Sequence, residues 1–205
     1  MTTVEDHQIF HITHVDNLPG IIQEGGLWCD KERIARELPC TNIGHLHIKQ
    51  RRLHRPVTTR AGGTLGDYVP FNFCPRSVML YVVSRGHTDY GGGQENIVHL
   101  VSSVSLAVVL GRPWAFTDRH AELAHALHFD DLAQLAEVPW RVMGMRYWTD
   151  VKEERQAEFL VREFFPWTAV TEIGTMTLSA AKQVLRAIKS ADHKPEVRAR
   201  PEWYY

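Results

Sequence analysis

Two pairs of polar residues have the types and the spacing of a catalytic cleft. Gln156 and Glu158 stand two positions apart in a stretch of strand character, so a period of two places both side chains on one face. His11 and Thr13 stand in the same relation near the start of the chain. Either pair alone also fits a strand with a polar exposed face. Two such strands together indicate a cleft in which a carboxylate can stabilise positive charge.

The cationic residues are distributed unevenly. The 205 residues carry a net charge of only −1, yet residues 38–66 contain no Asp or Glu. A locally basic segment in a nearly neutral chain is a candidate phosphate-binding surface. Charge alone equally fits a solvated loop that pairs with acids elsewhere. The cations of this segment are Lys49, Arg51, Arg52, Arg55 and Arg60.

Neither the cysteines nor the histidines predict a metal site. The three cysteines form no close CxxC pair, so they indicate neither a disulfide framework nor a thiolate zinc site. The best histidine candidates lack the spacing of zinc helices and a carboxylate to complete a ligand set. We therefore expect no protein-held metal. Those candidates are His45 with His47, and the group His120, His125 and His128.

Hydrophobic patterning predicts an α+β protein that folds as one domain over residues 1–205. Helices and strands alternate without a βαβ rhythm, and no GxGxxG follows a strand, which disfavours a Rossmann-type dinucleotide-binding fold. Pro70 indicates an edge or a bulge in its strand, and Asp16 is a candidate helix cap. We expect strands at 8–13, 68–73, 96–101, 156–161 and 170–176, helices at 18–22, 47–53, 120–135 and 178–188, and a terminal strand or docked aromatic residues after Asp192.

No stretch of the sequence approaches the roughly 20 apolar residues that span a bilayer. The first eight residues include two acids where a signal peptide has basic and then apolar residues. We expect a cytoplasmic protein without membrane contact.

A set of motifs lies in order along essentially the whole chain. These motifs are His11, Thr13, Asn17, Leu18 and Ile21, then residues 48–52, 67–73 and 75–81, Gln94 with 97–101, and 156–161. Together they resemble the DarT family of DNA ADP-ribosyltransferase toxins, and their extent makes the resemblance more specific than any single motif. The resemblance implies a split mixed β-sheet flanked by helices, the fold of ADP-ribosyltransferases.

The same resemblance implies an activity and partners. Members transfer ADP-ribose from NAD to a base in single-stranded DNA, thymidine in one branch and guanosine in another, and nicotinamide leaves. A macrodomain antitoxin of the DarG type removes the modification. We expect a thymidine-directed mono-ADP-ribosyltransferase toxin that uses NAD as co-substrate and needs no metal.

The resemblance also assigns roles to residues. Glu158 matches the catalytic glutamate, which stabilises the oxocarbenium-like state of glycosidic cleavage. Arg51 matches an arginine that reaches the NAD phosphates and assists catalysis, although Arg52 offers the same chemistry one position along. The predicted NAD-binding residues are His11, Ile12, Thr13, Asn17, Arg51 and the aromatic Tyr68.

The prediction for DNA contacts depends on residues just before Glu158. Single strands are gripped by cations and by aromatic rings on which bases stack. Residues 140–148 combine arginines, a tyrosine and two tryptophans, although these aromatics fit equally a seal over the core. The predicted substrate-binding residues are Arg52, Arg146, Tyr147, Trp148 and Gln156.

Other functions stay open at this point. An enzyme of the same fold could modify guanosine, RNA or protein. A non-catalytic module could bind nucleic acid through residues 38–66, and its binding would then depend on salt and not on NAD.

Overall fold

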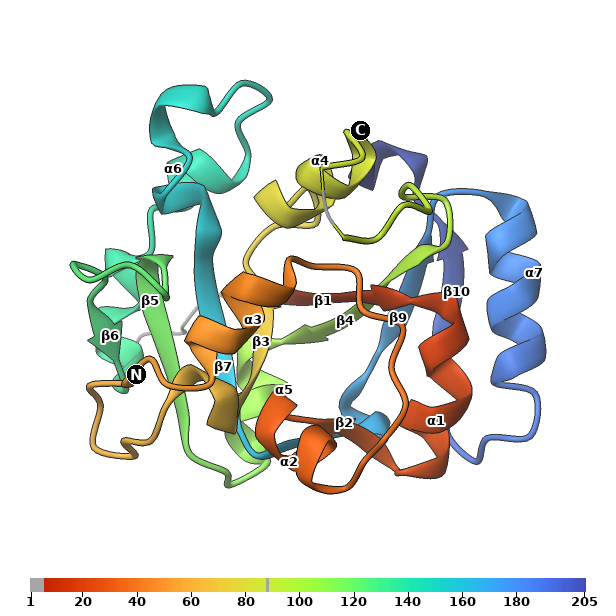
Figure 1. Cartoon of the computed structure of the whole chain (residues 1–205), viewed down its shortest axis with the longest axis horizontal. Helices are drawn as coiled ribbons and strands as arrows, with labels where there is room; N and C mark the ends of the chain where they lie inside the picture. The colour runs from red at the N-terminus through yellow and green to blue at the C-terminus, as the bar shows by residue number, and fades with distance from the viewer. Residues whose placement is uncertain (1–5, 88) are drawn as a thin grey trace.

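A computed structural model describes residues 6–87 and 89–205 (Figure 1). Most strands form one eight-stranded sheet in the order β10-β9-β4-β1-β3-β7-β5-β6, and β2 pairs with β8 separately. The strands are β1 (Gln8–His14), β2 (Gly26–Trp28), β3 (Tyr68–Asn72), β4 (Ile97–Ser103), β5 (Trp114–His120), β6 (His128–Phe129), β7 (Ala157–Arg162), β8 (Phe164–Pro166), β9 (Glu172–Thr175) and β10 (Glu196–Ala199). The predicted α+β class and the five predicted strands are confirmed.

Short helices surround this sheet. The longest, α7, covers β9 and β10 at one edge of the molecule, and α3 lies in front of β3 and β7 (Figure 1). No helix formed by residues 6–87 and 89–205 is long and apolar enough to cross a membrane. The α-helices are α1 (Leu18–Gln23), α2 (Asp30–Ala35), α3 (Leu46–Arg52), α4 (Val78–Ser84), α5 (Val104–Val109), α6 (Trp140–Met143) and α7 (Leu178–Ala187). The short 3-10 helices are η1 (Val15–Asn17), η2 (Leu65–Asp67), η3 (Leu132–Glu137), η4 (Thr149–Val151), η5 (Glu154–Gln156), η6 (Trp167–Ala169) and η7 (Pro201–Trp203).

The large sheet is split between β1 and β3. β1 pairs with β4 over its whole length, and β3 pairs with β7 throughout, but the backbone pairing of β1 with β3 is limited to Phe10 and Asn72. Pro70 lies at this split, where a residue without an N–H costs no ladder hydrogen bond. The predicted edge character of this strand therefore has a structural reason, although β3 is not an outermost strand.

One apolar core spans both halves of the sheet, with Ile9 and Leu100 from one half and phenylalanines from the other. Phe71, Phe116, Phe159 and Phe165 are fully buried in one apolar cluster, and burying each ring contributes roughly 2–3 kcal/mol relative to exposure. The tail after Asp192 forms β10 and then packs Tyr204 into a second cluster. Both structures expected of the tail are thus present.

The prediction of a helix at 120–135 is wrong. β5 extends to His120, the chain turns, and β6 returns antiparallel so that His128 lies opposite Thr117. Asp118 accepts a hydrogen bond from the backbone of Leu127, which fixes this turn. Pairing with an existing strand outweighs the local helix propensity of the segment, because propensity is a weak preference that tertiary contacts override.

Asp16 does not cap a helix as predicted. It lies inside η1, and its backbone N–H donates a hydrogen bond to Nδ1 of His14, the residue that caps this turn. The helix α1 then begins after Asn17, whose side chain makes no capping bond. Asn17 is engaged instead in contacts described below.

Candidate active site

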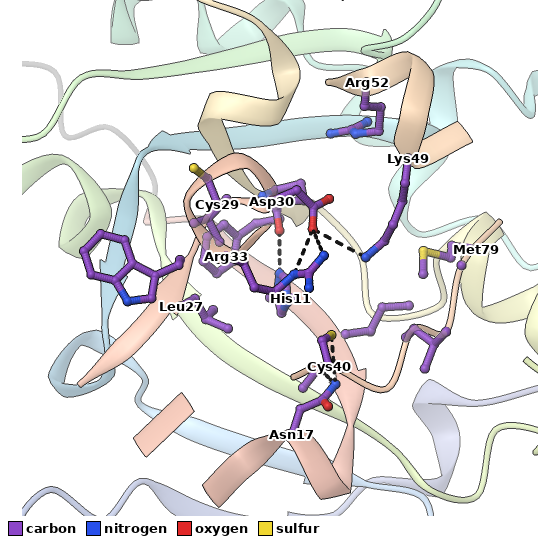
Figure 2. Close-up of a pocket in the computed structure, with 18 of the residues that line it drawn as sticks. His11, Asn17, Leu27, Cys29, Asp30, Arg33, Cys40, Lys49, Arg52 and Met79 are labelled. Carbon is purple, nitrogen blue, oxygen red and sulfur yellow. Dashed lines mark hydrogen bonds and ion pairs between the residues drawn. The ribbon is translucent and has the colours of Figure 1, made fainter. Parts of the chain in front are cut away.

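A cavity of about 670 Å³ opens at the split in the sheet. Its size falls within the range of pockets that bind small molecules and cofactors. Figure 2 shows side chains from β1, η1, α2 and α3 converging on it. Its lining includes His11, Ile12, Thr13, Asn17, Arg52, Gln156 and Glu158 from the predicted site. The two polar pairs, far apart in sequence, therefore share one cavity.

Glu158 and Arg52 form a bidentate ion pair on the cavity wall. Arg52 donates from Nη1 and Nη2 to the two carboxylate oxygens at 2.9 and 2.7 Å. The side chains are only 12% and 8% exposed. Burial acts against ionisation of Glu158, but the charge and hydrogen bonds of Arg52 outweigh it and keep the pKa of the carboxyl below its ordinary value. The site therefore holds an ionised carboxylate at neutral pH.

Neighbouring strands fix the position of Glu158. Its backbone N–H donates to the Thr117 hydroxyl at 3.0 Å, and its carboxylate accepts the Ala121 N–H at 3.4 Å. His120 lines the same cavity, and burial lowers the pKa of its imidazole against the attraction of Glu158. The hydrogen bonds that the carboxylate accepts from Arg52 and Ala121 both favour its charged form.

His11 presents a hydrogen-bond acceptor to the cavity. Its Nδ1 lies 2.8 Å from the carbonyl oxygen of Pro70, and a carbonyl only accepts, so Nδ1 carries the proton. Burial lowers the pKa of the imidazole, which keeps the ring neutral at pH 7. The Nε2 atom is then unprotonated and can accept from a hydroxyl group, such as that of a ribose.

Asn17 fastens a loop beside the cavity. Its Nδ2 donates to the Thr13 hydroxyl and to the carbonyl of Thr41, both at 3.0 Å, and its Oδ1 accepts from the Thr41 N–H at 2.8 Å. Cys40 lies at 3.6 Å from the same nitrogen (Figure 2). Thr13, Asn17, Cys40 and Thr41 all line the cavity. Asn17 therefore positions this part of the wall through its amide.

Cations gather around one acid on another part of the wall. Asp30 lies 3.4 Å from Arg33 Nε and 3.5 Å from Lys49 Nζ (Figure 2). Burial opposes ionisation of Asp30, but Lys49, Arg33 and Arg52 together hold the pKa of its carboxyl below its ordinary value. Arg33, Lys49 and Arg52 together carry one more charge than Asp30 and Glu158, and this excess of positive charge can attract an anionic ligand.

Arg51 and Arg52 lie in different surroundings. Positions 45, 48, 49 and 52 of the α3 region line the cavity, which is the spacing of one helix face. Arg51 lies outside that face, is exposed, and donates from Nε to Glu122 at 2.6 Å. Arg51 does not line the cavity, so the predicted catalytic and NAD-binding role fits Arg52, the arginine beside Glu158, better.

Tyr68 does not line the cavity, contrary to the expectation of an NAD contact. Its ring is 1% exposed and packs with Val57 and Leu65, and its hydroxyl donates to the carbonyl of Gly62 at 2.7 Å. The loop after α3 covers it. The following residues of β3, from Val69 to Asn72, line the cavity instead.

The residues predicted to bind DNA are divided between two places. Gln156 lines the cavity beside Glu158. Arg146 lines a second, smaller cavity, and Tyr147 is 81% exposed. Trp148 packs edge-on against Tyr81 and Tyr205, outside both linings.

Among the cavity residues that sequence reasoning missed are the four charged or titratable side chains described above, Asp30, Arg33, Lys49 and His120. Lys49 lay in the basic segment, but nothing singled it out before its helix face was known. His120 fell in a predicted helix, because residues 114–120 (WAFTDRH) lack the alternation of apolar and polar residues that marks a half-buried strand. Asp30 and Arg33 precede the basic segment and have no pattern that distinguishes them from a solvated helix.

No group of three or more His, Cys, Asp or Glu side chains in residues 6–87 and 89–205 is arranged to hold a metal ion. His45 and His47 have their rings 5.1 Å apart, without a third ligand in the described chain. His125 pairs with Glu153, and His128 Nδ1 lies 3.2 Å from the Thr58 hydroxyl.

Comparison with known proteins identifies the family. The family described as "ssDNA thymidine ADP-ribosyltransferase, DarT" matches residues 10–205. A DNA ADP-ribosyl transferase from Thermus sp. (strain 2.9) is 42% identical over 209 residues, covering 100% of this chain and 99% of the relative. The structure of Thermus sp. 2.9 DarT with ADP-ribosylated ssDNA superposes with a TM-score of 0.92 at 41% identity, covering 97% and 96% of the two chains. The structure of the Thermus protein with NAD+ gives 0.88 at 40% identity and covers 98% of each chain. The chain therefore belongs to the DarT family of ssDNA thymidine ADP-ribosyltransferases.

Proposed function

We propose that this protein transfers ADP-ribose from NAD to thymidine in single-stranded DNA, with Glu158 as the catalytic carboxylate. The observation that carries the proposal is the ionised Glu158, held by Arg52, in the same cavity as the acceptor nitrogen of His11. Membership of the DarT family and the Thermus structures with NAD+ and with modified DNA support it.

The cavity has the chemical groups that NAD needs. The neutral His11 offers an acceptor for a ribose hydroxyl, and Arg33, Lys49 and Arg52 offer positive charge to a diphosphate. Apolar walls made by Val69, Val78, Met79 and Val82 can hold an aromatic ring. We expect Thr13 and Asn17 to position NAD as neighbours of His11.

Glu158 would act on the nicotinamide glycosidic bond. As this bond breaks, its electron pair leaves with nicotinamide and positive charge develops on the ribose ring. A carboxylate fixed by two strands and an arginine needs no reorganisation to stabilise that charge. Arg52 keeps Glu158 ionised, so it serves the reaction by positioning the carboxylate and by maintaining its charge.

The proposal also names the base that receives ADP-ribose. A ring nitrogen of thymine must reach the ribose carbon from the side opposite the leaving nicotinamide, so the base must enter the same cavity. As the N–C bond forms, this nitrogen loses its proton, which the carboxylate of Glu158 can accept. Gln156 lines the cavity beside Glu158 and can contact the base. Guanosine is the alternative acceptor within the fold.

A panel of oligonucleotides tests this function. The protein is incubated with NAD and single strands that each contain one kind of base, and the DNA is weighed by mass spectrometry. We expect one ADP-ribose mass on the thymidine strand, none with Glu158→Gln, and normal modification with the control Arg51→Ala. Glu158→Gln should still bind NAD, because the lost charge is needed chiefly in the transition state.

Other outcomes would point elsewhere. A guanosine strand that alone gains mass would replace thymidine as acceptor. Labelled protein or RNA with clean DNA would indicate another substrate class. DNA binding without NAD dependence, unchanged in Glu158→Gln, would support a non-catalytic nucleic-acid-binding module.

The toxin role and the antitoxin partner stay part of this proposal. A protein that modifies bases blocks replication, so its host needs a partner that reverses or prevents the modification. We expect expression of the wild type to stop growth, Glu158→Gln to be tolerated, and co-expression of a DarG-type macrodomain to restore growth. Growth arrest by Glu158→Gln as strong as by the wild type would contradict this role.

A further inference from the structure

A second cavity, of about 240 Å³, lies beside the first. The two cavities flank the same two chain segments. Arg76 lines the second cavity just before α4, whose Val78 and Met79 line the first, and Arg155 lines the second just before Gln156 of the first. Figure 1 shows α4 and α6 at the same end of the sheet. The complete lining is Pro75, Arg76, Met143, Gly144, Met145, Arg146, Arg155 and Glu202.

Three arginines give this small cavity an unbalanced positive charge. Arg76, Arg146 and Arg155 form no ion pair within residues 6–87 and 89–205. Arg155 is only 3% exposed, and its guanidinium donates solely to backbone carbonyls among the described residues. The acid in the lining, Glu202, is exposed and pairs with Arg200 at 3.9 Å. Charges taken from water without a counter-ion are costly, so an anion bound here would be stabilised.

Arg76 also offers a hydrogen-bond donor that no described residue accepts. Its Nε is buried and makes no hydrogen bond to any described residue. The guanidinium lies over the ring of Tyr205, 4.3 Å from its centroid, which holds it in place. Buried donors are nearly always paired in folded proteins, so an unpaired one marks a place for an acceptor from outside the chain.

Aromatic residues lie next to this cation-rich cavity, outside its lining. Trp148 packs against both Tyr81 and Tyr205, with ring centroids 5.3 and 6.4 Å away, and the Arg155 guanidinium lies 5.7 Å from the Trp148 ring. The neighbouring Tyr147 is 81% exposed. Cations next to exposed aromatic rings are the combination that holds single-stranded nucleic acid.

We propose that the second cavity binds a backbone phosphate of the DNA strand whose target base enters the first cavity. Arg76 and Arg146 contact the phosphodiester oxygens. Arg155 contributes a buried positive charge, and its hydrogen bonds to the carbonyls of Arg76, Val142 and Met143 hold the two sides of the cavity in place. This inference rests on the proposed function, because it assumes that the target base of a DNA strand occupies the first cavity. The strand would then pass Gln156 on its way to the second cavity. A phosphodiester and a free phosphate present the same oxygens, so the test separates the two sources.

The test measures DNA binding without NAD. A labelled single strand containing one thymidine is titrated with the full-length protein over a series of KCl concentrations. The variants are Arg76→Gln, Arg146→Gln and the double variant. The carbonyl of Arg76 accepts hydrogen bonds from Arg155 and Tyr205 and is kept in the variant, and the side chain loses only its contact with the Tyr205 ring, so we expect Arg76→Gln to fold. Arg186→Gln, on exposed α7 at the opposite edge of the molecule, is the matched control (Figure 1).

We expect each charge removed to weaken DNA binding roughly threefold to tenfold at low salt. The slope of log Kd against log salt should fall by about 0.7 for each phosphate that the variant no longer neutralises. During transfer the KM for DNA should rise while kcat and the affinity for NAD stay at wild-type values. Arg186→Gln should match the wild type in every measurement.

An unchanged affinity and salt slope in the double variant, in a protein that modifies DNA normally, would overturn the phosphate site while leaving the proposed function intact. A wild type that binds NAD but neither binds nor modifies DNA would instead refute the proposed function. Inorganic phosphate that competes with the oligonucleotide for the wild type, and not for the double variant, would support the site. Inorganic phosphate that raises the Tm of the wild type alone, with DNA binding equal in both proteins, would assign the cavity to free phosphate and overturn the DNA path.

Discussion

Replacing Arg52 by Met removes the cation that holds Glu158 ionised in the wall of the main cavity. The two side chains are 12% and 8% exposed and share two hydrogen bonds, of 2.9 and 2.7 Å. Loss of one partner from a buried pair costs about 3–5 kcal/mol, because the other charge is left without compensation. Since the pair borders a cavity that water can enter, we expect the lower end, about 3 kcal/mol of unfolding free energy at pH 7.

The sign of the pH dependence should change with this substitution. In the wild type the folded pKa of Glu158 lies below its ordinary value of 4.5, so its contribution to stability is present above pH 4.5 and is lost as the pH falls through the folded pKa. Without Arg52, burial is no longer outweighed and the folded pKa rises above 4.5. The contribution of Glu158 to stability is then greatest at low pH and is lost as the pH rises through the new value.

Urea unfolding at several pH values, combined with a double-mutant cycle, measures this effect. Glu158→Gln removes the charge, so Arg52→Met should cost much less in that background. Arg51→Met, which removes an exposed arginine from the same helix, is the control and should leave stability close to that of the wild type. A cost for Arg52→Met that is equal in both backgrounds and constant with pH would refute the reasoning.

Three further predictions concern other parts of the structure. His11→Ala should raise the KM for NAD. In the wild type, NAD affinity measured by calorimetry should be constant above pH 6.5 and should fall at lower pH. The reason is that burial keeps the pKa of His11 below 6.5, and protonation of Nε2 removes the hydrogen-bond acceptor. A wild-type affinity that instead rises towards low pH would contradict this role. Asn17→Ala should also raise the KM for NAD, with kcat nearly unchanged, because it releases the loop at Thr41; steady-state kinetics that show a loss in kcat alone would exclude this explanation. Tyr204→Phe should lower the unfolding free energy by about 1–2 kcal/mol in urea without changing transfer, since its buried hydroxyl donates to the carbonyl of Ile97 at 2.8 Å; an unchanged stability would show that this bond contributes nothing.

Alternation of apolar and polar residues was sufficient to predict the strands that carry the two polar pairs. It placed His11 with Thr13 and Gln156 with Glu158, and the structure brings all four to one cavity. The strand that ends at His120 was not predicted. Its identity depends on pairing with β7 and β6, a long-range contact that a local pattern does not contain.

The roles of charged residues were harder to predict than their presence. Arg51 and Arg52 are chemically identical, and only the helix face distinguishes the one that meets Glu158 from the one that meets Glu122. Asp30 and Lys49 are 19 positions apart in sequence, yet their side chains form an ion pair at 3.5 Å. No rule of local spacing predicts such a contact. Helix phase and long-range ion pairing therefore account for the missing part of the site.

The single residue pair between β1 and β3 has a consequence for ligand binding. Main-chain hydrogen bonds join the halves of the sheet least where the cavity opens, and His11 belongs to one half while Glu158 belongs to the other. A ligand in contact with both side chains would add cross-links at the weakest junction of the backbone. Its binding energy should then oppose separation of the halves, and amides bordering the junction should exchange with solvent more slowly in the ligated protein.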